Sequence, residues 1–94
     1  MRIVYAESAL ADLDEIYAYQ TKHWPAVRAP FAARLVAIHQ LIADHPFGAP
    51  QVAERPGVRV IGVTPYPYRI FYKVVGERIE VLRVHHASRR DLFE

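Results

Sequence analysis

The sequence predicts an α+β domain of the order β-α-α-β-β-β, with a helical hairpin packed on one face of a small, mostly antiparallel sheet. Three observations support this fold class. The chain opens on a β-prone run, two stretches with apolar residues at three- and four-residue spacing follow, and the last third alternates in the manner of paired strands. A chain of 94 residues suits a single domain, 1–94, with a small core, so we expect neither a separate cofactor domain nor a cofactor.

The first predicted elements are a short strand over residues 2–5 and an amphipathic helix. Ser8 is placed to cap this helix by accepting a hydrogen bond from an amide of the first turn. The helix should end before Pro25, because the residue that precedes a proline is disfavoured in the α region. Asp12, Asp14 and Glu15 are expected on its solvent side. Its buried stripe should hold the residues that recur every three or four positions, which are Leu10, Leu13, Ile16, Tyr17 and Gln20.

A second helix is predicted from about Ala29 to Asp44. A start at Pro25 would leave Pro30 in the helix interior, where a proline costs about 3 kcal/mol. His45-Pro46 ends the helix, and the two helices should pack as a pair against one face of the sheet. The apolar face is expected to hold Phe31, Leu35, Ile38 and Ile42, with Leu41 at its flank.

Three strands are predicted in the last part of the chain, after a turn-rich loop over residues 47–57. The first covers residues 58–63, and Pro65 and Pro67 stiffen the loop that follows it. The second runs from Tyr68 to about Val75, and Gly76-Glu77-Arg78 turns the chain into the third, Ile79 to Val84, which continues into His85 and His86.

Neither face of this hairpin is cleanly polar. The two-residue period of a strand places Phe71 on one face with Arg69 and Lys73, and the last strand bears aliphatic residues on both faces. An antiparallel sheet covered on one side only should instead alternate apolar and polar residues. We therefore expect a basic and apolar groove that binds an acidic, amphipathic peptide of another chain, by helix-in-groove packing or by strand addition.

The charged residues are distributed unevenly along the chain. Residues 1–54 carry a net charge of −2, whereas residues 55–90 carry a net charge of +6. Solvated arginines on the strands would explain this pattern without any function. The alternative is a positive surface that attracts an acidic partner, either nucleic acid or an acidic peptide.

The composition argues against several kinds of site. The chain has no cysteine, which excludes a disulfide, a thiolate zinc site and a cysteine nucleophile. His23, His39 and His45 lack the spacing of metal ligands, so we expect no metal site. The first residues lack the apolar segment of a signal peptide, and the longest apolar run is far too short to span a membrane. We therefore expect a cytoplasmic protein without membrane contact.

Three segments carry a resemblance to a known family. They are Ala11 to Tyr19 in the first helix, His45-Pro46 after the second, and the hairpin from Tyr68-Arg69-Ile70-Phe71-Tyr72 to Arg90. In this order and spacing they resemble the RelE/ParE superfamily of bacterial toxins, and most closely the ParE or plasmid-stabilisation toxins. The resemblance spans nearly the whole chain. It implies the toxin of a type II toxin-antitoxin pair, held inactive by its antitoxin in a hetero-oligomer.

Members of this superfamily have one of two activities. RelE-like members cleave mRNA on the ribosome, which needs groups to accept and donate a proton and cations to hold the phosphate. For this alternative, the resemblance and the residue types implicate Arg69, His85, His86 and Arg89. Neighbouring strand residues point to opposite faces, so at most one of the two histidines would serve a given site. The chain also departs from the nuclease pattern, since lysine occurs only at Lys22 and Lys73, and Phe93 stands where a tyrosine is expected.

ParE-like members lack the nuclease residues and are associated with inhibition of DNA gyrase. We therefore expect a toxin that inhibits DNA gyrase by binding, without catalysis, and that a ParD-like antitoxin neutralises. A homologue that has lost its toxicity and only binds its antitoxin is a further alternative. The recognition surface is expected to include Arg59, Tyr68, Arg69, Phe71, Lys73, Leu82, Arg83, Val84, Arg89 and Arg90.

Overall fold

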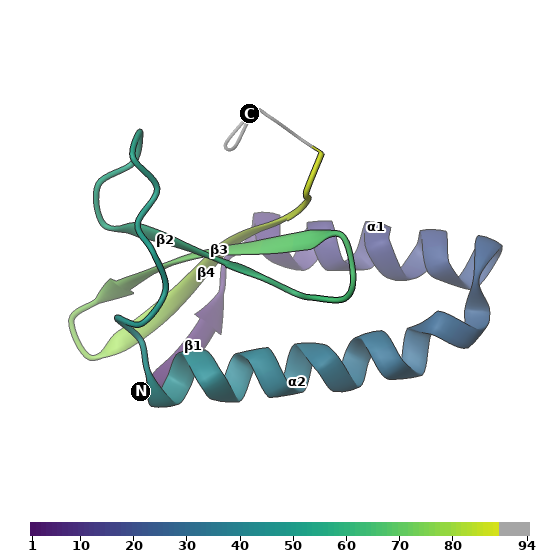
Figure 1. The fold of residues 1–94 in the computed structure, drawn as a ribbon, viewed down its shortest axis with the longest axis horizontal. Coiled ribbons are helices and arrows are strands. Elements are labelled where there is room, and N and C mark those ends of the chain that lie inside the picture. The colour runs from purple at the N-terminus through teal and green to yellow at the C-terminus, as the bar shows by residue number, and fades with distance from the viewer. Residues whose placement is uncertain (89–94) are drawn as a thin grey trace.

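The structure, a computed structural model, describes residues 1–88 and confirms the predicted order of elements (Figure 1). A strand and two helices come first, and three strands follow. Pro25 lies in the turn between the helices and Pro30 in the first turn of the second helix, the two places where a proline is tolerated. The elements are β1 (Arg2–Tyr5), α1 (Glu7–His23), a 3-10 turn (Pro25–Val27), α2 (Arg28–Asp44), β2 (Val58–Gly62), β3 (Tyr68–Val75) and β4 (Arg78–His86).

The four strands form one sheet in the order β1-β4-β3-β2. β1 pairs in parallel with β4, whereas the other two pairings are antiparallel, as the sequence predicts. β1 and β2 are the edge strands. The loop before β2 lies along its outer edge, where Val52 N–H donates to Val58 O at 2.8 Å and Val60 N–H donates to Pro50 O at 3.0 Å. Part of this edge is therefore closed by the chain itself.

A β-bulge in β4 changes which residues share a face. Phe71 pairs with Arg83 and the next residue, Tyr72, pairs with Val81, so Leu82 is the extra residue. Simple alternation along β4 predicts Val81 and Val84 on opposite faces. Because of the bulge both lie on the helix side of the sheet, within the main core.

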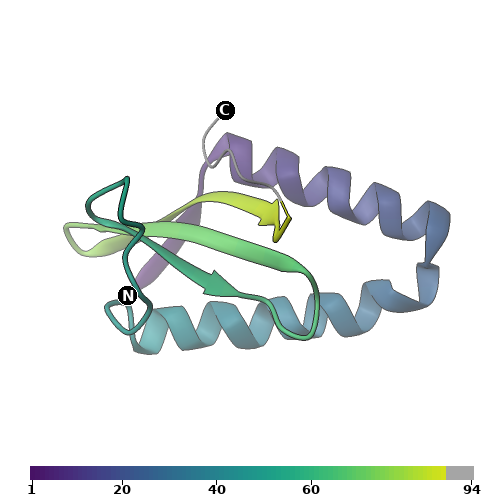
Figure 2. The ribbon, with the colours of Figure 1, turned by 45° about the horizontal axis from the view of Figure 1, so that its top comes forward.

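The main core lies between the sheet and the helices. Phe31, Ile38 and Ile42 of α2 are at most 2% exposed, which confirms the predicted apolar face of this helix. Figure 2 shows that the helical hairpin continues past the ends of the strands. The buried members of this core are Ala9, Ile16, Phe31, Ile38, Ile42, Ala49, Val63, Ile70, Tyr72, Ile79, Val81 and Val84.

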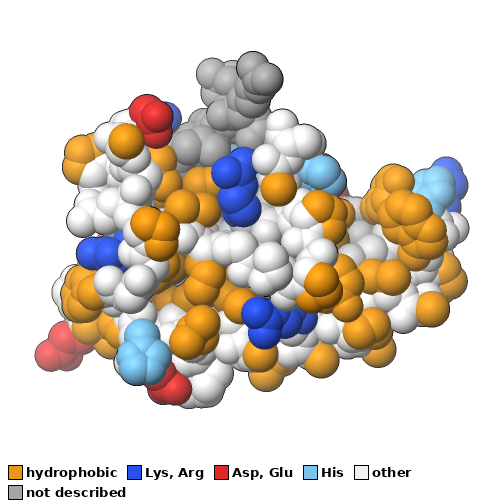
Figure 3. All heavy atoms as spheres, in the orientation of Figure 1, with side chains coloured by type: hydrophobic (Ala, Val, Ile, Leu, Met, Phe, Trp, Pro, Cys, Tyr) orange, Lys and Arg blue, Asp and Glu red, His pale blue; other side chains and the backbone are white. Residues whose placement is uncertain are grey.

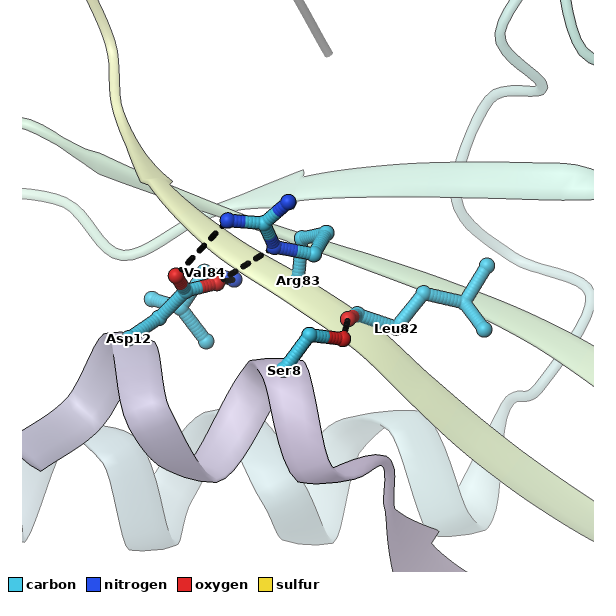
Figure 4. A network of polar contacts seen from close by, with 5 residues as sticks. All are labelled: Ser8, Asp12, Leu82, Arg83 and Val84. Carbon is cyan, nitrogen blue, oxygen red and sulfur yellow. Dashed lines mark hydrogen bonds and ion pairs between the residues drawn. The ribbon is translucent and has the colours of Figure 1, made fainter. Parts of the chain in front are cut away.

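α1 continues the edge of the sheet beside the second half of β4. β1 pairs with β4 only as far as Val81, and beyond it two side chains of α1 bond to the backbone of β4. Ser8 Oγ donates to Leu82 O at 3.0 Å, and an oxygen of Asp12 accepts from Val84 N–H at 2.9 Å (Figure 4). The i, i+4 spacing of Ser8 and Asp12 matches the two-residue step along the strand.

These contacts correct two predictions for α1. Ser8 does not cap the helix, because α1 begins at Glu7 with Ala6 in the N-cap position and without a side-chain cap. The buried stripe is also rotated from the predicted one: Asp12 is on it, whereas Leu10 is 50% exposed. The pattern missed this rotation because the bonds to β4 compensate the cost of burying the carboxylate.

A second, smaller apolar cluster lies on the face of the sheet opposite the main core, which we call the outer face. Phe71 is 1% exposed and packs there with Val52 and Val58, and Val60 and Leu82 border the cluster. The loop that carries Val52 thus covers part of the face that the sequence left open. No helix within residues 1–88 has the length and apolar character needed to cross a membrane.

Candidate functional site

The outer face brings together several of the charged residues predicted for recognition. Arg69 pairs in register with His85, Phe71 with Arg83, and Lys73 with Glu80, so these side chains share that face. The structure then distinguishes residues that are available for a partner from residues that hold the fold together.

Arg83 belongs to the second group. Its Nε and one terminal nitrogen donate to the two carboxylate oxygens of Asp12 at 2.8 and 2.9 Å (Figure 4). Both side chains are largely shielded, at 17% and 10% exposed for Arg83 and Asp12. The bidentate geometry is the strongest that an arginine and a carboxylate form. Arg83 is therefore committed to α1 and leaves little of its charge for a partner.

The environment shifts the pKa of both members of this pair. Burial alone would raise the pKa of Asp12, but the bonds from Arg83 and from Val84 N–H, with the charges of Arg83 and His85, hold it below its usual value. The hydrogen bond to Asp12 raises the pKa of Arg83, burial opposes this, and the charges of Asp12 and Glu15 add to it. The pair therefore stays ionised at neutral pH.

Arg59 also has a structural role. One terminal nitrogen donates to Phe47 O at 3.0 Å and to Ala49 O at 2.7 Å, and the guanidinium lies 5.3 Å from the centre of the Phe47 ring. Tyr72 supports the same loop, since its hydroxyl donates to Pro46 O at 2.9 Å. These bonds fasten the segment after α2 onto the sheet.

Arg69 holds the end of β4 on the outer face. Its terminal nitrogen donates to Ala87 O at 2.8 Å, and Ala87 N–H donates to Pro67 O at 2.7 Å. His86 Nδ1 and Ser88 Oγ, 2.7 Å apart, form a hydrogen bond just beyond the strand. The chain is thus fixed up to Ser88. Arg89 and Arg90, which were predicted for recognition, and Phe93 lie outside the described residues.

The two histidines lie on opposite sides of the sheet. His85 is 2% exposed on the outer face, with its ring 5.6 Å from that of Phe71. His86 is exposed on the other side and packs edge-on against Tyr68, with 5.4 Å between ring centres. Of the residues implied for a nuclease, Arg69 and His85 therefore share a face and His86 does not, while Arg89 is not described. Within residues 1–88, no cluster of three or more His, Cys, Asp or Glu side chains is arranged to hold a metal.

The three apolar residues predicted for recognition, Phe71, Leu82 and Val84, differ in burial and in the face on which they lie. Phe71 is buried in the outer-face cluster, and Leu82 borders it. Val84 is 3% exposed and lies in the main core, because the bulge turns it toward the helices. Lys73 is half-buried on the outer face, and Tyr68 is half-buried on the helix side. The three apolar residues therefore do not form one exposed patch.

A cleft that the sequence did not reveal lies where the helical hairpin passes the ends of the strands. It has a volume of about 600 Å³ and is mostly apolar. Figure 3 shows apolar side chains gathered at this end of the molecule, beside basic ones. The lining includes five aromatic or imidazole rings and one amide, from Tyr19, Trp24, Tyr66, Tyr68, His86 and Gln20. We call it the aromatic cleft.

The walls of the aromatic cleft are held in place by ring packing. Phe31 is fully buried and lies edge-on to Tyr66 and Tyr68, with ring centres 5.3 and 5.5 Å away. Tyr19 packs against Trp24 at 5.7 Å, yet these two side chains remain 49% and 59% exposed. One sequence signal could have pointed here, namely a tryptophan between the helices, just where no core position is expected.

Comparison with known proteins identifies the family. A family model described as the ParE toxin of the type II toxin-antitoxin system parDE matches residues 3–91. Toxin ParE1 of Caulobacter vibrioides is 38% identical over 82 residues, which is 85% of this chain and 82% of that protein. Both matches extend over most of the chain.

Solved structures agree with this assignment. A chain of the chromosomal ParDE system of P. aeruginosa is 26% identical, with a TM-score of 0.71 over 94% of this chain and 97% of that one. The isolated RelE toxin of E. coli shares the fold at 22% identity, with a TM-score of 0.57 over 96% of this chain and 87% of its own. The chain therefore belongs to the ParE toxin family and is a ParE-like toxin of a type II toxin-antitoxin system.

Proposed function

We propose that this toxin acts in the cytoplasm by binding DNA gyrase, without catalysis of its own, and that a ParD-like antitoxin neutralises it. The observation that carries the proposal is the separation of the groups that a nuclease would need. His85 is buried beside Phe71 and His86 is on the other side of the sheet, so within residues 1–88 the two histidines do not face one phosphate as an acid and a base. Catalysis by general acid and base requires both groups within hydrogen-bonding reach of the reacting atoms.

The antitoxin part is supported by the distribution of charge and by the relatives. Residues 16–43 and 55–76 contain no acidic residue, but they carry seven basic ones. A surface built from these segments favours an acidic partner. The family model and the P. aeruginosa structure both belong to parDE systems, in which toxin and antitoxin are paired.

The gyrase part is supported by what remains available on the outer face. Lys73 is half-exposed, whereas Arg59 and Arg83 are committed to internal bonds. A half-exposed cationic side chain contributes to association by steering and by complementarity, and it makes or breaks no bond.

The test is a supercoiling assay with purified gyrase and the full-length toxin, with a parallel assay for stabilised DNA cleavage. We expect inhibition by the wild type at micromolar concentration and weaker inhibition by Lys73→Ala. Lys22→Ala serves as the matched control, because Lys22 is an exposed lysine in the last turn of α1 and does not lie on the outer face. It should inhibit as the wild type does.

A ribosome assay tests the alternative activity. Programmed ribosomes incubated with the toxin should keep their mRNA intact. Cleavage of the message at the decoding site, together with uninhibited gyrase, would refute the proposed target. Harmless expression in bacteria together with an unaffected gyrase would indicate a homologue that has lost its toxicity.

A further inference from the structure

The aromatic cleft contains a polar atom that the fold itself leaves unsatisfied. Gln20 is 3% exposed, and its side-chain oxygen has no hydrogen-bond partner among residues 1–88. A buried polar group without a partner costs about 1–3 kcal/mol. The terminal torsion of a glutamine is soft, so the amide can turn its oxygen toward the cleft that it lines.

Most of the lining of the aromatic cleft comes from segments without acidic residues. Seven of its lining residues come from the segments 16–43 and 55–76, which contain no aspartate or glutamate. The basic residues of the helical part are Lys22, Arg28 and Arg34; Arg28 lies 5.2 Å from the centre of the Tyr17 ring, and Arg34 bonds to Thr64 O in the loop that carries Tyr66. Basic residues therefore lie on the side of the helical hairpin, whereas Asp12 and Glu15 line a neighbouring hollow that shares Tyr68 and His86 with the cleft.

The rim of the cleft is apolar and exposed. Trp24 and Tyr19 are about half-exposed although their rings pack on each other. Soluble proteins rarely expose several large apolar side chains together around a hollow, and such a hollow marks a binding site. The cleft therefore offers stacking surfaces and one buried acceptor, with basic residues on its helical side.

We propose that the aromatic cleft binds an acidic segment of the antitoxin through one aromatic side chain that donates a hydrogen bond to the amide oxygen of Gln20. Tryptophan and tyrosine combine a large apolar body with a single donor group. Either side chain can therefore pack against the rings of the cleft and donate a hydrogen bond to the amide oxygen. Acidic residues beside this anchor lie toward the basic residues of the helical hairpin, Lys22, Arg28 and Arg34. The inference rests on the proposed pairing with an antitoxin, and it adds where the partner binds and which chemistry selects it.

Three single variants of the full-length toxin test this site. Gln20→Met keeps an unbranched side chain of similar length but removes the amide, and Trp24→Ala removes one wall of the rim. Val36→Ala is the control, because Val36 is 69% exposed on α2 and does not line the cleft. Binding to the antitoxin encoded in the neighbouring reading frame is measured by calorimetry, and folding by urea denaturation.

We expect Trp24→Ala and Gln20→Met each to weaken antitoxin binding at least tenfold, while Val36→Ala binds as the wild type does. Gln20→Met should unfold at the same urea concentration as the wild type or at a higher one, because it removes an unsatisfied buried group. A merely structural role for Gln20 would not produce weaker binding together with unchanged or higher stability. Equal binding by all four proteins overturns the inference and leaves the proposed antitoxin pairing intact.

If the antitoxin does not bind the wild type, the proposed pairing is refuted. Synthetic peptides then test whether the cleft itself binds an acidic aromatic segment. The probe is acetyl-Glu-Glu-Trp-Glu-Glu-amide, compared with versions that carry Phe for Trp or Lys for Glu. Shifts of the Gln20 side-chain amide and the Trp24 indole signals in NMR spectra, strongest with the first peptide, support the cleft as a site for an acidic aromatic segment. Absent shifts, or equal shifts with all three peptides, overturn it.

Discussion

Asp12 and Arg83 join the first helix of the chain to its last strand through two hydrogen bonds of 2.8 and 2.9 Å. The same carboxylate also accepts the backbone N–H of Val84, 72 residues away in the sequence. One side chain thus satisfies both an arginine and the strand backbone at the place where β1 no longer covers β4. This small network fixes how α1 lies along the sheet.

Removing this carboxylate should destabilise the fold strongly. Asp12→Ala leaves a shielded guanidinium and a strand N–H without their partner, and breaking such a pair costs about 3 kcal/mol or more. Asp14→Ala is the matched control, because Asp14 is an exposed acid on the same helix. Urea denaturation of the three proteins measures the difference, and equal unfolding free energies for Asp12→Ala and Asp14→Ala would show that the network contributes little.

The same pair predicts how stability depends on pH. The pKa of Asp12 in the folded protein lies below 3.8, its ordinary value, so the unfolded chain takes up the proton first as the pH falls. The contribution of Asp12 is therefore complete above this value and is lost as the pH falls through the folded pKa. Unfolding free energies at pH 7, 5, 4 and 3 should drop more for the wild type than for Asp12→Asn, which cannot titrate. Parallel curves for the two proteins would contradict the shift.

Arg59 is expected to act on the loop after α2 and not on a partner. Arg59→Ala removes two hydrogen bonds to loop carbonyls and the contact with the Phe47 ring, which together stabilise the loop by about 2 kcal/mol. Limited proteolysis should therefore cut within residues 47–57 faster in this variant. Arg55→Ala, in the same loop, is the comparison for a change of charge. If the loop is cut at the same rate as in the wild type but partner binding is weaker, Arg59 contacts the partner, as predicted from the sequence.

Val84 and Leu82 should respond differently to truncation. Val84→Ala opens a cavity in the main core and should cost about 2 kcal/mol, whereas Leu82→Ala acts at a half-exposed position and should cost about 1 kcal/mol. Thermal unfolding separates the two. Antitoxin binding by the folded fraction of Val84→Ala should equal that of the wild type; a specific binding defect in a stable Val84→Ala protein would restore its predicted role as an exposed anchor.

The elements of the fold were predictable because their signals are local. Pro25 and His45-Pro46 mark the end of each helix, and the apolar spacing from Phe31 to Ile42 identifies the buried face of α2. The tight turn at Gly76, where φ is 59°, likewise follows from a glycine between two β-prone runs. Such signals need no knowledge of distant residues.

The position of Asp12 was not predictable in this way. Periodicity assigns a carboxylate to solvent, and only its partners on β4 make its burial favourable. No sequence pattern indicates the bulge at Leu82 either. The faces on which Val84 and His85 lie could therefore not be predicted from the alternation of residues along the strand. The aromatic cleft depends on the hairpin passing the ends of the strands, which is a property of the whole fold.

The extra residue at Leu82 has a consequence for the variation that this fold tolerates. If a relative lacks that one residue, strict alternation resumes and every later side chain keeps its side: the counterpart of Val84 still faces the core and that of His85 still faces outward. If the residue is kept and the bulge is straightened, every side chain after it changes sides instead. A relative can therefore be one residue shorter here and present the same surface at the end of β4, whereas a change that removes the bulge alone exchanges the two surfaces.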